Sequence, residues 1–332
     1  MRKKRVSSKD VAKEAGVSQA TVSYVLNNNK NIKIKPETRQ AVLDAVKKLN
    51  YHPSLLARAM KLNKSMTVGV ITDRNVTNYN FMRMLEGIKD QLQEFNYAIT
   101  LLFNKSEETF NDEILEYYNT NRLDGIIFAL AIVSDETKEK LNKSKLPYVV
   151  VDSHATGNKA HEVGTDHLKQ LTELVAVFKA RGATRIAYVG PKWKCKLDPR
   201  LGAFKDAIRD NKLINHGLYL CRFNDEKIRE MIYGLLDNKE RPQGIVAGAP
   251  RYGFHSLKVA CSLGIRVPGE LYLASLGTSM YHDLCHPTMT AVELPMYDMG
   301  KEGARVLLDI MNDREAKAVT ILPSKIVTRE SL

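Results

Sequence analysis

The chain has 332 residues, of which 44% are hydrophobic and 27% charged, as in an ordinary soluble globular protein of two or three domains. No apolar run approaches the roughly 18 residues of a membrane span, and no apolar stretch follows the basic start as in a signal peptide. We therefore expect a cytoplasmic protein without a membrane partner. The 4 cysteines are far apart and none is in a CxxC pair, which indicates reduced thiols rather than a disulfide framework or a zinc site.

The net charge of +12 is concentrated at the start of the chain. Residues 1–65 contain 15 Lys and Arg against 4 Asp and Glu, a net charge of +11, which leaves +1 for residues 66–332. A basic head on a neutral body is the electrostatic pattern of a nucleic-acid-binding module attached to another domain. A solvated basic tail would share the charge but would lack the helical periodicity of this segment.

The head is predicted to begin with two short helices joined by a tight turn. Ser7 and Asp10 have the spacing of a capping box, so a helix should start near residue 8, and Gly16 fits the left-handed position that ends it. Ser18 then caps a second helix over 18–27. So short a gap is typical of a helix-turn-helix, whose second helix enters the major groove of DNA.

A third helix and a linker follow. Pro36 suits the first turn of the third helix. Its predicted buried stripe consists of Val42, Leu43, Val46 and Leu49. After Pro53, residues 54–61 have a helix-forming composition but are too few to form a stable helix alone.

From residue 66 onward, short apolar runs alternate with amphipathic stretches, which predicts an α/β fold with parallel sheets. The predicted strands are 67–72, 98–103, 124–130, 147–152, 185–190, 217–222, 244–248 and 271–276. Helices are predicted between them, for example over 81–95, 168–181, 200–211 and 254–263. The sequence has no Walker loop, GxSxG motif or Rossmann glycine fingerprint, so we expect neither an enzyme nor a cofactor.

The segments "DVAKEAGVSQATVSYVLN", "KPETRQAVLDAVKKLNYHPSLLARAM" and "KSMTVGVI" resemble the head, hinge and first core strand of the LacI/GalR family of bacterial transcription regulators. The similarity continues through "GATRIAYVGP", "PRLGAFKDAI" and "HPTMTAVELPMYDMGKEGARVLLDIM", so it covers essentially the whole chain. It implies a helix-turn-helix domain at 1–52, a hinge at 53–65, and an effector-binding and dimerisation core at 66–332.

The core of this family consists of two doubly wound parallel-sheet subdomains with a ligand cleft between them, similar to type I periplasmic binding proteins. The resemblance implies an N-terminal subdomain of about 66–164 and 293–322. The C-terminal subdomain would comprise about 165–292 and 323–332.

Members of the family bind a pseudo-palindromic double-stranded operator as homodimers, with one head for each half-site. The resemblance implies that Gln19, Ala20 and Tyr24 face bases. Further residues would contact phosphates or flank the bases, namely Ser18, Thr21, Ser23, Asn27 and Thr38. Gln can form a bidentate pair with adenine, and an Ala methyl can contact the thymine methyl. Tyr24 stands where many relatives carry Arg, so either the operator differs there or the ring packs along the groove wall.

The hinge segment 54–61 would order only on specific DNA. In relatives, paired hinge helices insert a Leu pair into the minor groove, and Met60 stands at that position here. Ser54, which replaces the usual Asn, and Ala57 are the other DNA contacts predicted in this segment. The alternative for Met60 is an apolar residue on the surface.

The expected effector residues match the family only in part. Arg200 stands where relatives place an Arg that holds sugar hydroxyls, and Asp166 matches an Asp near the subdomain hinge. In contrast, Pro250 and Gly277 stand where carboxylates are usual, and their loss leaves sugar hydroxyls without acceptors. A neutral sugar bound in the usual way is therefore disfavoured.

A basic loop follows the fifth predicted strand. Lys192, Lys194, Lys196 and Arg200 surround Trp193, the only Trp in the chain. One hypothesis is an anionic effector such as a phosphorylated sugar, with the ring stacked on its apolar face and the cations on its phosphate. The alternative is a solvated loop beside a vestigial pocket.

The resulting prediction is a dimeric repressor of a carbohydrate or related metabolic operon, controlled by a ligand in the core cleft. A catabolite-control-type global regulator, switched by a co-regulator protein docked on the N-terminal subdomain, is the alternative. A periplasmic-type solute-binding protein is disfavoured by the basic head and the lack of a signal peptide. The side chains His282, Asp283, Cys285 and His286 are metal-ligand types, but their spacing matches no zinc pattern, so no metal is expected.

Overall fold

The computed structural model describes residues 6–26, 32–51, 64–103, 107–152, 160–192 and 198–332. The chain forms two compact units, Met1–Ser65 and Met66–Leu332, which are described separately here as the head and the core. None of the described helices combines the length and the apolar character needed to cross a membrane.

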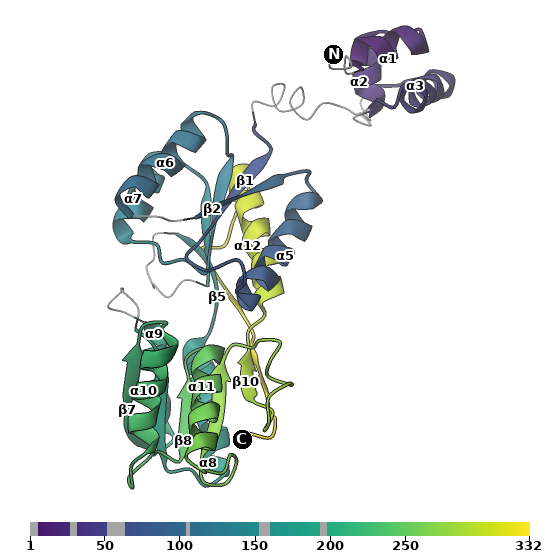
Figure 1. Cartoon of the computed structure of the whole chain (residues 1–332). Helices are drawn as coiled ribbons and strands as arrows, with labels where there is room; N and C mark the ends of the chain where they lie inside the picture. Colours follow the sequence, from purple (N-terminus) through teal and green to yellow (C-terminus); the bar gives the residue numbers. More distant parts are fainter. Residues whose placement is uncertain (1–5, 27–31, 52–63, 104–106, 153–159, 193–197) are drawn as a thin grey trace. The chain divides into compact units, whose positions relative to one another are not determined.

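The described part of the head contains α1 (Ser8–Ala15), α2 (Gln19–Leu26) and α3 (Pro36–Lys48) (Figure 1). At the start of α1, the Asp10 carboxylate accepts hydrogen bonds from the Ser7 backbone nitrogen at 2.8 Å and the Ser7 hydroxyl at 2.7 Å. Gly16 follows α1 with φ 63°, a left-handed conformation that allows the sharp turn into α2. The two predicted helices and their turn are therefore present.

A small apolar core joins these helices. Its buried residues are Val11, Ala12, Val22, Val25, Val42 and Ala45. The prediction that Leu43 is buried was wrong, because its side chain is 43% exposed. On a helix with 3.6 residues per turn, Val42 and Ala45 share the inner face, while position 43 lies about 100° away from position 42.

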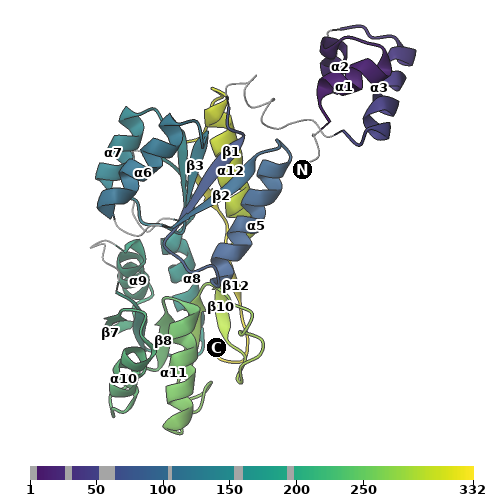
Figure 2. The same cartoon turned by 45° about the horizontal axis from the view of Figure 1, so that its top comes forward.

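The first sheet of the core has the strand order β11-β5-β4-β3-β1-β2 and is parallel throughout. Its strands are β1 (Thr67–Thr72), β2 (Ala98–Phe103), β3 (Gly125–Ala129), β4 (Tyr148–Val151), β5 (His161–Thr165) and β11 (Val319–Leu322). One face is covered by α5 (Tyr79–Gln93) and α12 (Met296–Met311), and the other by α6 (Glu107–Asn119) and α7 (Asp135–Lys143) (Figure 2).

The second sheet has the order β12-β10-β9-β8-β6-β7, with β12 antiparallel to its neighbour. Its strands are β6 (Arg185–Pro191), β7 (Ile214–Cys221), β8 (Gly244–Ala247), β9 (Tyr272–Leu276), β10 (Thr290–Glu293) and β12 (Lys325–Val327). One face packs on α8 (His167–Ala180) and α9 (Pro199–Asp210), and the other on α10 (Asp225–Leu236) and α11 (Pro250–Ser262).

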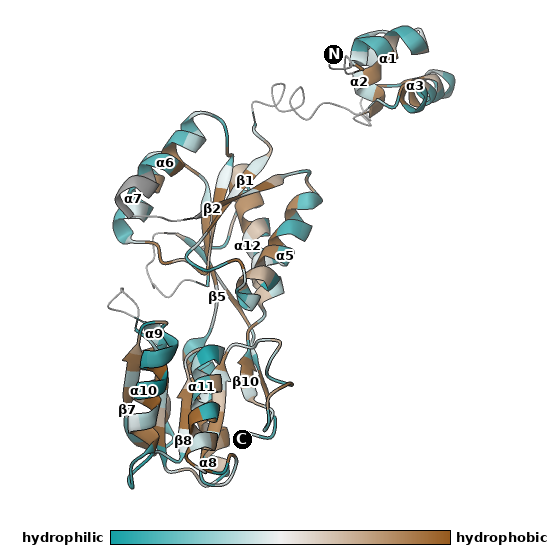
Figure 3. Cartoon of the chain, viewed as in Figure 1, coloured by the Kyte–Doolittle hydropathy of each residue, from teal (hydrophilic) through white to brown (hydrophobic). Residues whose placement is uncertain are grey.

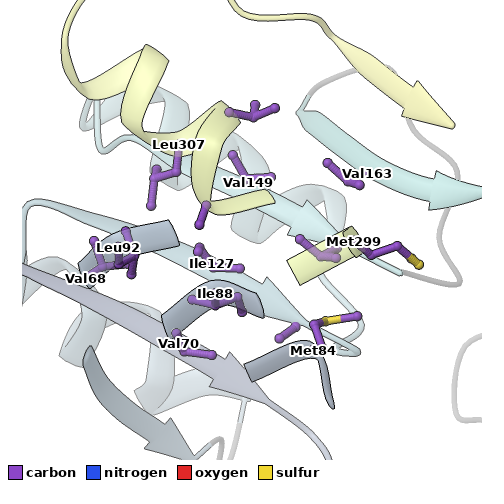
Figure 4. Packing of buried hydrophobic residues seen from close by; sticks show 14 of the residues in the cluster. Val68, Val70, Met84, Ile88, Leu92, Ile127, Val149, Val163, Met299 and Leu307 are labelled. Carbon is purple, nitrogen blue, oxygen red and sulfur yellow. The ribbon is translucent and has the colours of Figure 1, made fainter. Parts of the chain in front are cut away.

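Buried aliphatic side chains account for the stability of each sheet layer. In the first sheet, Val68 and Val70 of β1 pack with Ile88 of α5 and Leu307 of α12 (Figure 4). Figure 3 shows the same pattern along the core, with hydrophobic strands beneath helices whose outer faces are hydrophilic. Burying such side chains removes apolar area from water, which stabilises the folded state by roughly 25 cal/mol for each Å² buried.

The helices α5 and α12 approach each other unusually closely. A Cβ atom on Gly87 would lie 2.0 Å from the Tyr297 carbonyl oxygen, and one on Gly300 would lie 2.0 Å from the Met84 carbonyl oxygen. Only glycine fits at these two positions, because the opposing atoms belong to backbone and cannot rotate away.

The chain passes between the two sheets from β5 to α8, from β10 to α12 and from β11 to β12. Every strand predicted from the sequence is present with small shifts at its ends. The sequence pattern missed β5, β10, β11 and β12, which are short and contain polar residues rather than continuous apolar runs. In open parallel sheets, loops at the carboxyl ends of the strands form the ligand sites, and the candidate effector residues lie there.

Candidate DNA-binding surface and effector site

The N-terminal end of α2 presents small polar side chains to solvent. Val22 and Val25 face the head core, which leaves Ser18, Gln19 and Ala20 exposed. The Ser18 hydroxyl accepts a hydrogen bond from the Thr21 backbone nitrogen at 3.1 Å and caps the helix. The side chains that family resemblance assigns to bases and phosphates therefore start a well-capped helix.

Gln19 is held from the neighbouring helix. Its Nε2 donates a hydrogen bond of 2.7 Å to the hydroxyl of Ser8, the first residue of α1. Ser8 is not among the DNA contacts predicted from the sequence. The two residues are 11 positions apart in the sequence, so no local pattern predicts this contact.

The other predicted DNA contacts are less exposed or not described. Ser23, Tyr24 and Thr38 are all half-buried on the head. Asn27, Ser54, Ala57 and Met60 lie outside the described residues, so their proposed contacts with DNA stay predictions.

In the core, a buried ion pair lies at the start of α9. The guanidinium of Arg200 donates from Nε and Nη2 to the two carboxylate oxygens of Asp198, at 2.9 and 2.7 Å. Its Nη1 donates to the Gly248 carbonyl oxygen at 3.0 Å. Each of the two residues is only 8% exposed. Because all three nitrogens of Arg200 already donate to the protein itself, its capacity to hold sugar hydroxyls is reduced.

Electrostatics at this ion pair favours the charged forms. Burial opposes the charge on Arg200, but the neighbouring Tyr188 and Asp198 outweigh it and raise the pKa of the guanidinium. Burial also opposes the charge on Asp198, yet hydrogen bonds from Arg200 and its positive charge hold the pKa of that carboxyl below its usual range. Burial raises the pKa of Tyr188 to about 12, although Arg200 acts in the opposite direction.

Tyr188 lies beneath this pair. Its ring centroid is 5.5 Å from that of Phe204, and a Cβ atom on Gly248 would lie 2.2 Å from its hydroxyl oxygen. The hydroxyl has no hydrogen-bond partner among the described residues, although it is fully buried.

Charged residues that follow strands of the first sheet interact with the same ion pair. Burial lowers the pKa of Arg74, and the positive charge of Arg200 lowers it further, while Asp73 and Asp152 oppose the shift. Asp152 follows β4 and is only 5% exposed, and its charge also helps to raise the pKa of Arg200. Arg74 and Asp152 follow strands of the first sheet, while Arg200 and Asp198 follow a strand of the second. These four charged residues therefore lie together at the junction of the two sheets.

The remaining candidate effector residues lie around these charges. Asp166 caps α8 and accepts a hydrogen bond from the Lys169 backbone nitrogen at 2.9 Å. The charge of the adjacent His167 contributes to the lowered pKa of Asp198. A Cβ atom on Gly277 would lie 3.1 Å from Asn80 Nδ2 of α5 and 3.9 Å from Pro250 Cδ. The described candidates thus gather at the junction, whereas Trp193 lies outside the described residues.

In the segment after β9, which contains His282 and His286, several side chains form hydrogen bonds within the protein. Ser275 donates to the Gly277 carbonyl oxygen at 2.9 Å, so His282 Nε2, at 2.8 Å from the Ser275 hydroxyl, acts as a donor. His282 is fully buried, and Asp283 pairs with Arg329 at 2.5 Å. Within the part of the chain that the structure describes, no group of three His, Cys, Asp or Glu could hold a metal ion.

The sequence predicted no role for Asp198, Tyr188, Arg74 or Asp152. A local signal existed only for Asp198, whose position directly before Pro199 is typical of a helix cap. The other three meet through tertiary structure, because they follow or belong to strands of two different sheets.

Comparison with known proteins identifies the family. Residues 8–54 match the model of bacterial regulatory proteins of the lacI family, and residues 175–332 match the periplasmic binding protein-like domain. Catabolite control protein A of Staphylococcus aureus strain MRSA252 is 30% identical over 324 residues, which cover 96% of this chain and 97% of that protein. The chain belongs to the LacI family of bacterial regulatory proteins.

Other matches agree with this assignment. Catabolite control protein A of Staphylococcus xylosus is 29% identical over 327 residues, covering 96% of this chain and 97% of the relative. The solved lac repressor dimer bound to operator and the anti-inducer ONPF has a TM-score of 0.85 at 18% identity and covers 99% of both chains. The transcription regulator CcpA of Lactococcus lactis has a TM-score of 0.71 at 21% identity, covering 80% of this chain and 98% of that one.

This LacI-family protein is therefore a DNA-binding transcription regulator. The predicted fold class, a helix-turn-helix head followed by two parallel-sheet subdomains like those of periplasmic binding proteins, is confirmed.

Proposed function

We propose that this regulator is a homodimeric repressor that acts in the cytoplasm on the operator of a metabolic operon, with α2 of each head in the major groove. The observation that carries the proposal is the exposed polar start of α2 on a head with a net charge of +11. The solved lac repressor, a dimer bound to operator, supports the same arrangement. Predicted DNA contacts are Ser18, Gln19, Ala20, Thr21, Ser23, Tyr24, Asn27, Thr38, Ser54, Ala57 and Met60.

An apolar surface on the core supports dimerisation. The loop after β9 exposes Met280, Tyr281 and Leu284, with Leu284 74% exposed. The start of α5 also exposes Tyr79 and Met82. Asn80, in the same turn of α5, lies close to Gly277 at the base of the loop. Groups of exposed apolar side chains are typical of protein interfaces, and we propose that a second copy of the chain buries these.

For the effector, we infer a small anionic metabolite bound at the junction of the two sheets. Arg74 and Arg200 support this inference, because they bring two positive charges close together at this junction. An anionic group at the junction would stabilise these charges. Pro250 and Gly277 supply no side-chain carboxylates for sugar hydroxyls, which makes a neutral sugar a poorer fit.

The effector inference is tested by calorimetry on the full chain with matched pairs of neutral and phosphorylated sugars. We expect only phosphorylated compounds to bind, and Arg74→Gln to weaken that binding at least 10-fold, since a charge-assisted hydrogen bond is lost. Arg83→Gln, on the outer surface of α5, is the matched control. Equal binding of neutral and phosphorylated sugars would contradict an anionic effector.

A second candidate is control by a partner protein. The relatives named catabolite control protein A favour it, as does the replacement of the usual sugar-binding carboxylates by Pro250 and Gly277. The purified protein alone discriminates between the two. If it binds operator and a metabolite changes the affinity, the small-effector version stands, whereas a need for a second protein supports the alternative.

We also infer that the chain has no catalytic activity of its own. The pairing of Ser275 with His282 resembles part of a catalytic set, but both side chains are fully buried and the serine hydroxyl donates to Gly277. A buried hydroxyl with its proton engaged in this way cannot attack a substrate.

Operator binding is tested by selecting genomic fragments with the purified protein at moderate salt. We expect palindromic sites, few and beside one transport or catabolic operon if the protein is a local repressor. Many related sites across metabolic genes would instead indicate a global regulator. Recovery of unrelated fragments without a shared site would refute sequence-specific binding.

A further inference from the structure

The contact between Ser8 and Gln19 connects the two helices of the DNA-binding motif. Gln19, the first residue of α2, is exposed, while Ser8, the first residue of α1, is half-buried. The Gln19 Nε2 atom lies 2.7 Å from the Ser8 hydroxyl oxygen and donates to it. An exposed amide on the DNA-facing end of α2 is thus held by a neighbouring helix instead of by solvent alone.

The two ends of this hydrogen bond are fixed by the head core. Val11 of α1 and Val22 of α2 are both fully buried, and the Val17 backbone nitrogen donates to the Ala12 carbonyl oxygen at 3.0 Å in the turn between the helices. Because α1 and α2 cannot shift relative to each other without opening this core, Ser8 is a fixed acceptor for Gln19.

The hydrogen bond leaves the DNA-reading edge of Gln19 intact. A glutamine amide has two N–H groups and a carbonyl oxygen, and Ser8 takes only one N–H. The second N–H and Oε1 are the pair that adenine needs in the major groove, where N7 accepts and the N6 amino group donates. A free glutamine on a surface samples many rotamers, so holding one of them in advance reduces the entropy lost on binding.

We propose that Ser8 is a specificity-determining residue of the head, which positions the Gln19 amide to read an adenine. Ser8 acts through Gln19 and not by its own contact with a base. This inference rests on the proposed binding of an operator by α2, and it adds a residue outside the recognition helix to the residues that set the operator sequence.

The experiment is a selection from randomised half-sites with the full-length protein, its Ser8→Ala and Ser8→Thr variants, and Gln19→Ala. We expect the wild type to select adenine at one position of the half-site, and we expect Gln19→Ala to lose this preference. Ser8→Ala should weaken the preference at that position about 3- to 10-fold and leave the other positions unchanged. Ser8→Thr retains the hydroxyl and should restore most of the preference.

Binding isotherms separate positioning from a structural role. Ser8→Ala should have no further effect in the Gln19→Ala background, or on an operator in which the adenine has been replaced. The slope of log K against log salt concentration should be the same for wild type and Ser8→Ala, since no phosphate contact is removed. Circular dichroism of the variants checks that the helices are retained.

Several outcomes would overturn the inference. Ser8→Ala could weaken binding to all sequences equally, which would indicate a structural or phosphate-contacting role. It could instead strengthen binding, which would mean that Ser8 withholds Gln19 from DNA. If the wild type selects a sequence but no adenine depends on Gln19, the positioning role fails as well. If the wild type selects no sequence at all, the proposed operator binding fails first.

Discussion

The head and the core differ in how they assemble their functional residues. In the head, Ser18, Gln19 and Ala20 are consecutive on one helix, and local rules of capping and periodicity place them at its exposed start. In the core, Arg74 and Arg200 come from two different sheets and meet only through the fold. A DNA-reading helix is therefore built from neighbouring residues, whereas a site between two sheets depends on the whole topology.

The two regions also differ in how their polar groups are satisfied. The Arg200 guanidinium is closed in by Asp198 and Gly248, while the exposed Gln19 amide retains groups for an external partner. We therefore expect Arg200 to act mainly on the stability of the core and Gln19 mainly on recognition.

The largest effect is expected for Asp198→Ala. It leaves the buried charge of Arg200 without its bidentate partner, and breaking a buried pair in this way costs about 3–5 kcal/mol of unfolding free energy. Urea unfolding of the core measures the loss. Asp206→Ala, which removes an exposed partner of Arg209, is the control and should leave stability unchanged. A small effect of Asp198→Ala would show that Arg200 is not held mainly by this pair.

A smaller effect, confined to the head, is expected for Gly16→Ala. Gly16 has φ 63°, and nothing lies within 4 Å of an added Cβ atom, so the cost comes from backbone conformation alone. We expect a loss of about 1 kcal/mol, measured by thermal unfolding of the head followed by circular dichroism. Gly182 (φ 90°) lies in the core, and its replacement by Ala should leave the head transition unchanged.

The smallest effect is a pH dependence of the core. Burial lowers the pKa of His282 below its ordinary value of 6.5, and the charge of Arg329 adds to this, while the Ser279 backbone and Asp283 oppose it. Because the unfolded chain then binds more protons than the folded one, the contribution of His282 is complete above pH 6.5 and is lost as the pH falls below that value.

The measurement is urea unfolding of the wild type and His282→Gln at pH 7.5 and 5.5. The wild type should lose more stability than the variant over this interval, since glutamine keeps polar groups but does not titrate. The same loss in both proteins would assign the pH dependence to other groups that titrate between these two pH values.

Local features of the fold were predictable from the sequence, and long-range ones were not. Gly16, Ser18 and eight of the strands follow from turn chemistry and apolar runs. Leu43 was misplaced, because an apolar residue beside a buried stripe can lie on the exposed side of a short helix. The edge strand β11 is only 4 residues long, and its exposed residues are the apolar Val319 and Ile321, so the usual alternation of buried apolar and exposed polar residues is missing.

The candidate effector site was only half predictable. The position of Arg200 followed from family resemblance, but its closure by Asp198 and its opposition to Arg74 depend on packing. Asn27, Met60 and Trp193 lie outside the described residues, and their roles stay predictions.

We propose that the head reads a specific DNA sequence through the start of α2. The most direct measurement compares binding of the full-length protein to its best selected fragment and to the same fragment with both half-sites scrambled, at 150 mM salt. The account predicts at least a roughly 1000-fold preference for the intact fragment, the lower end for specific regulators. We also expect Gln19→Ala to lower that preference about 5- to 150-fold for each half-site, the cost of one bidentate base contact. Equal affinity for both fragments, or an unchanged preference in Gln19→Ala, would contradict it.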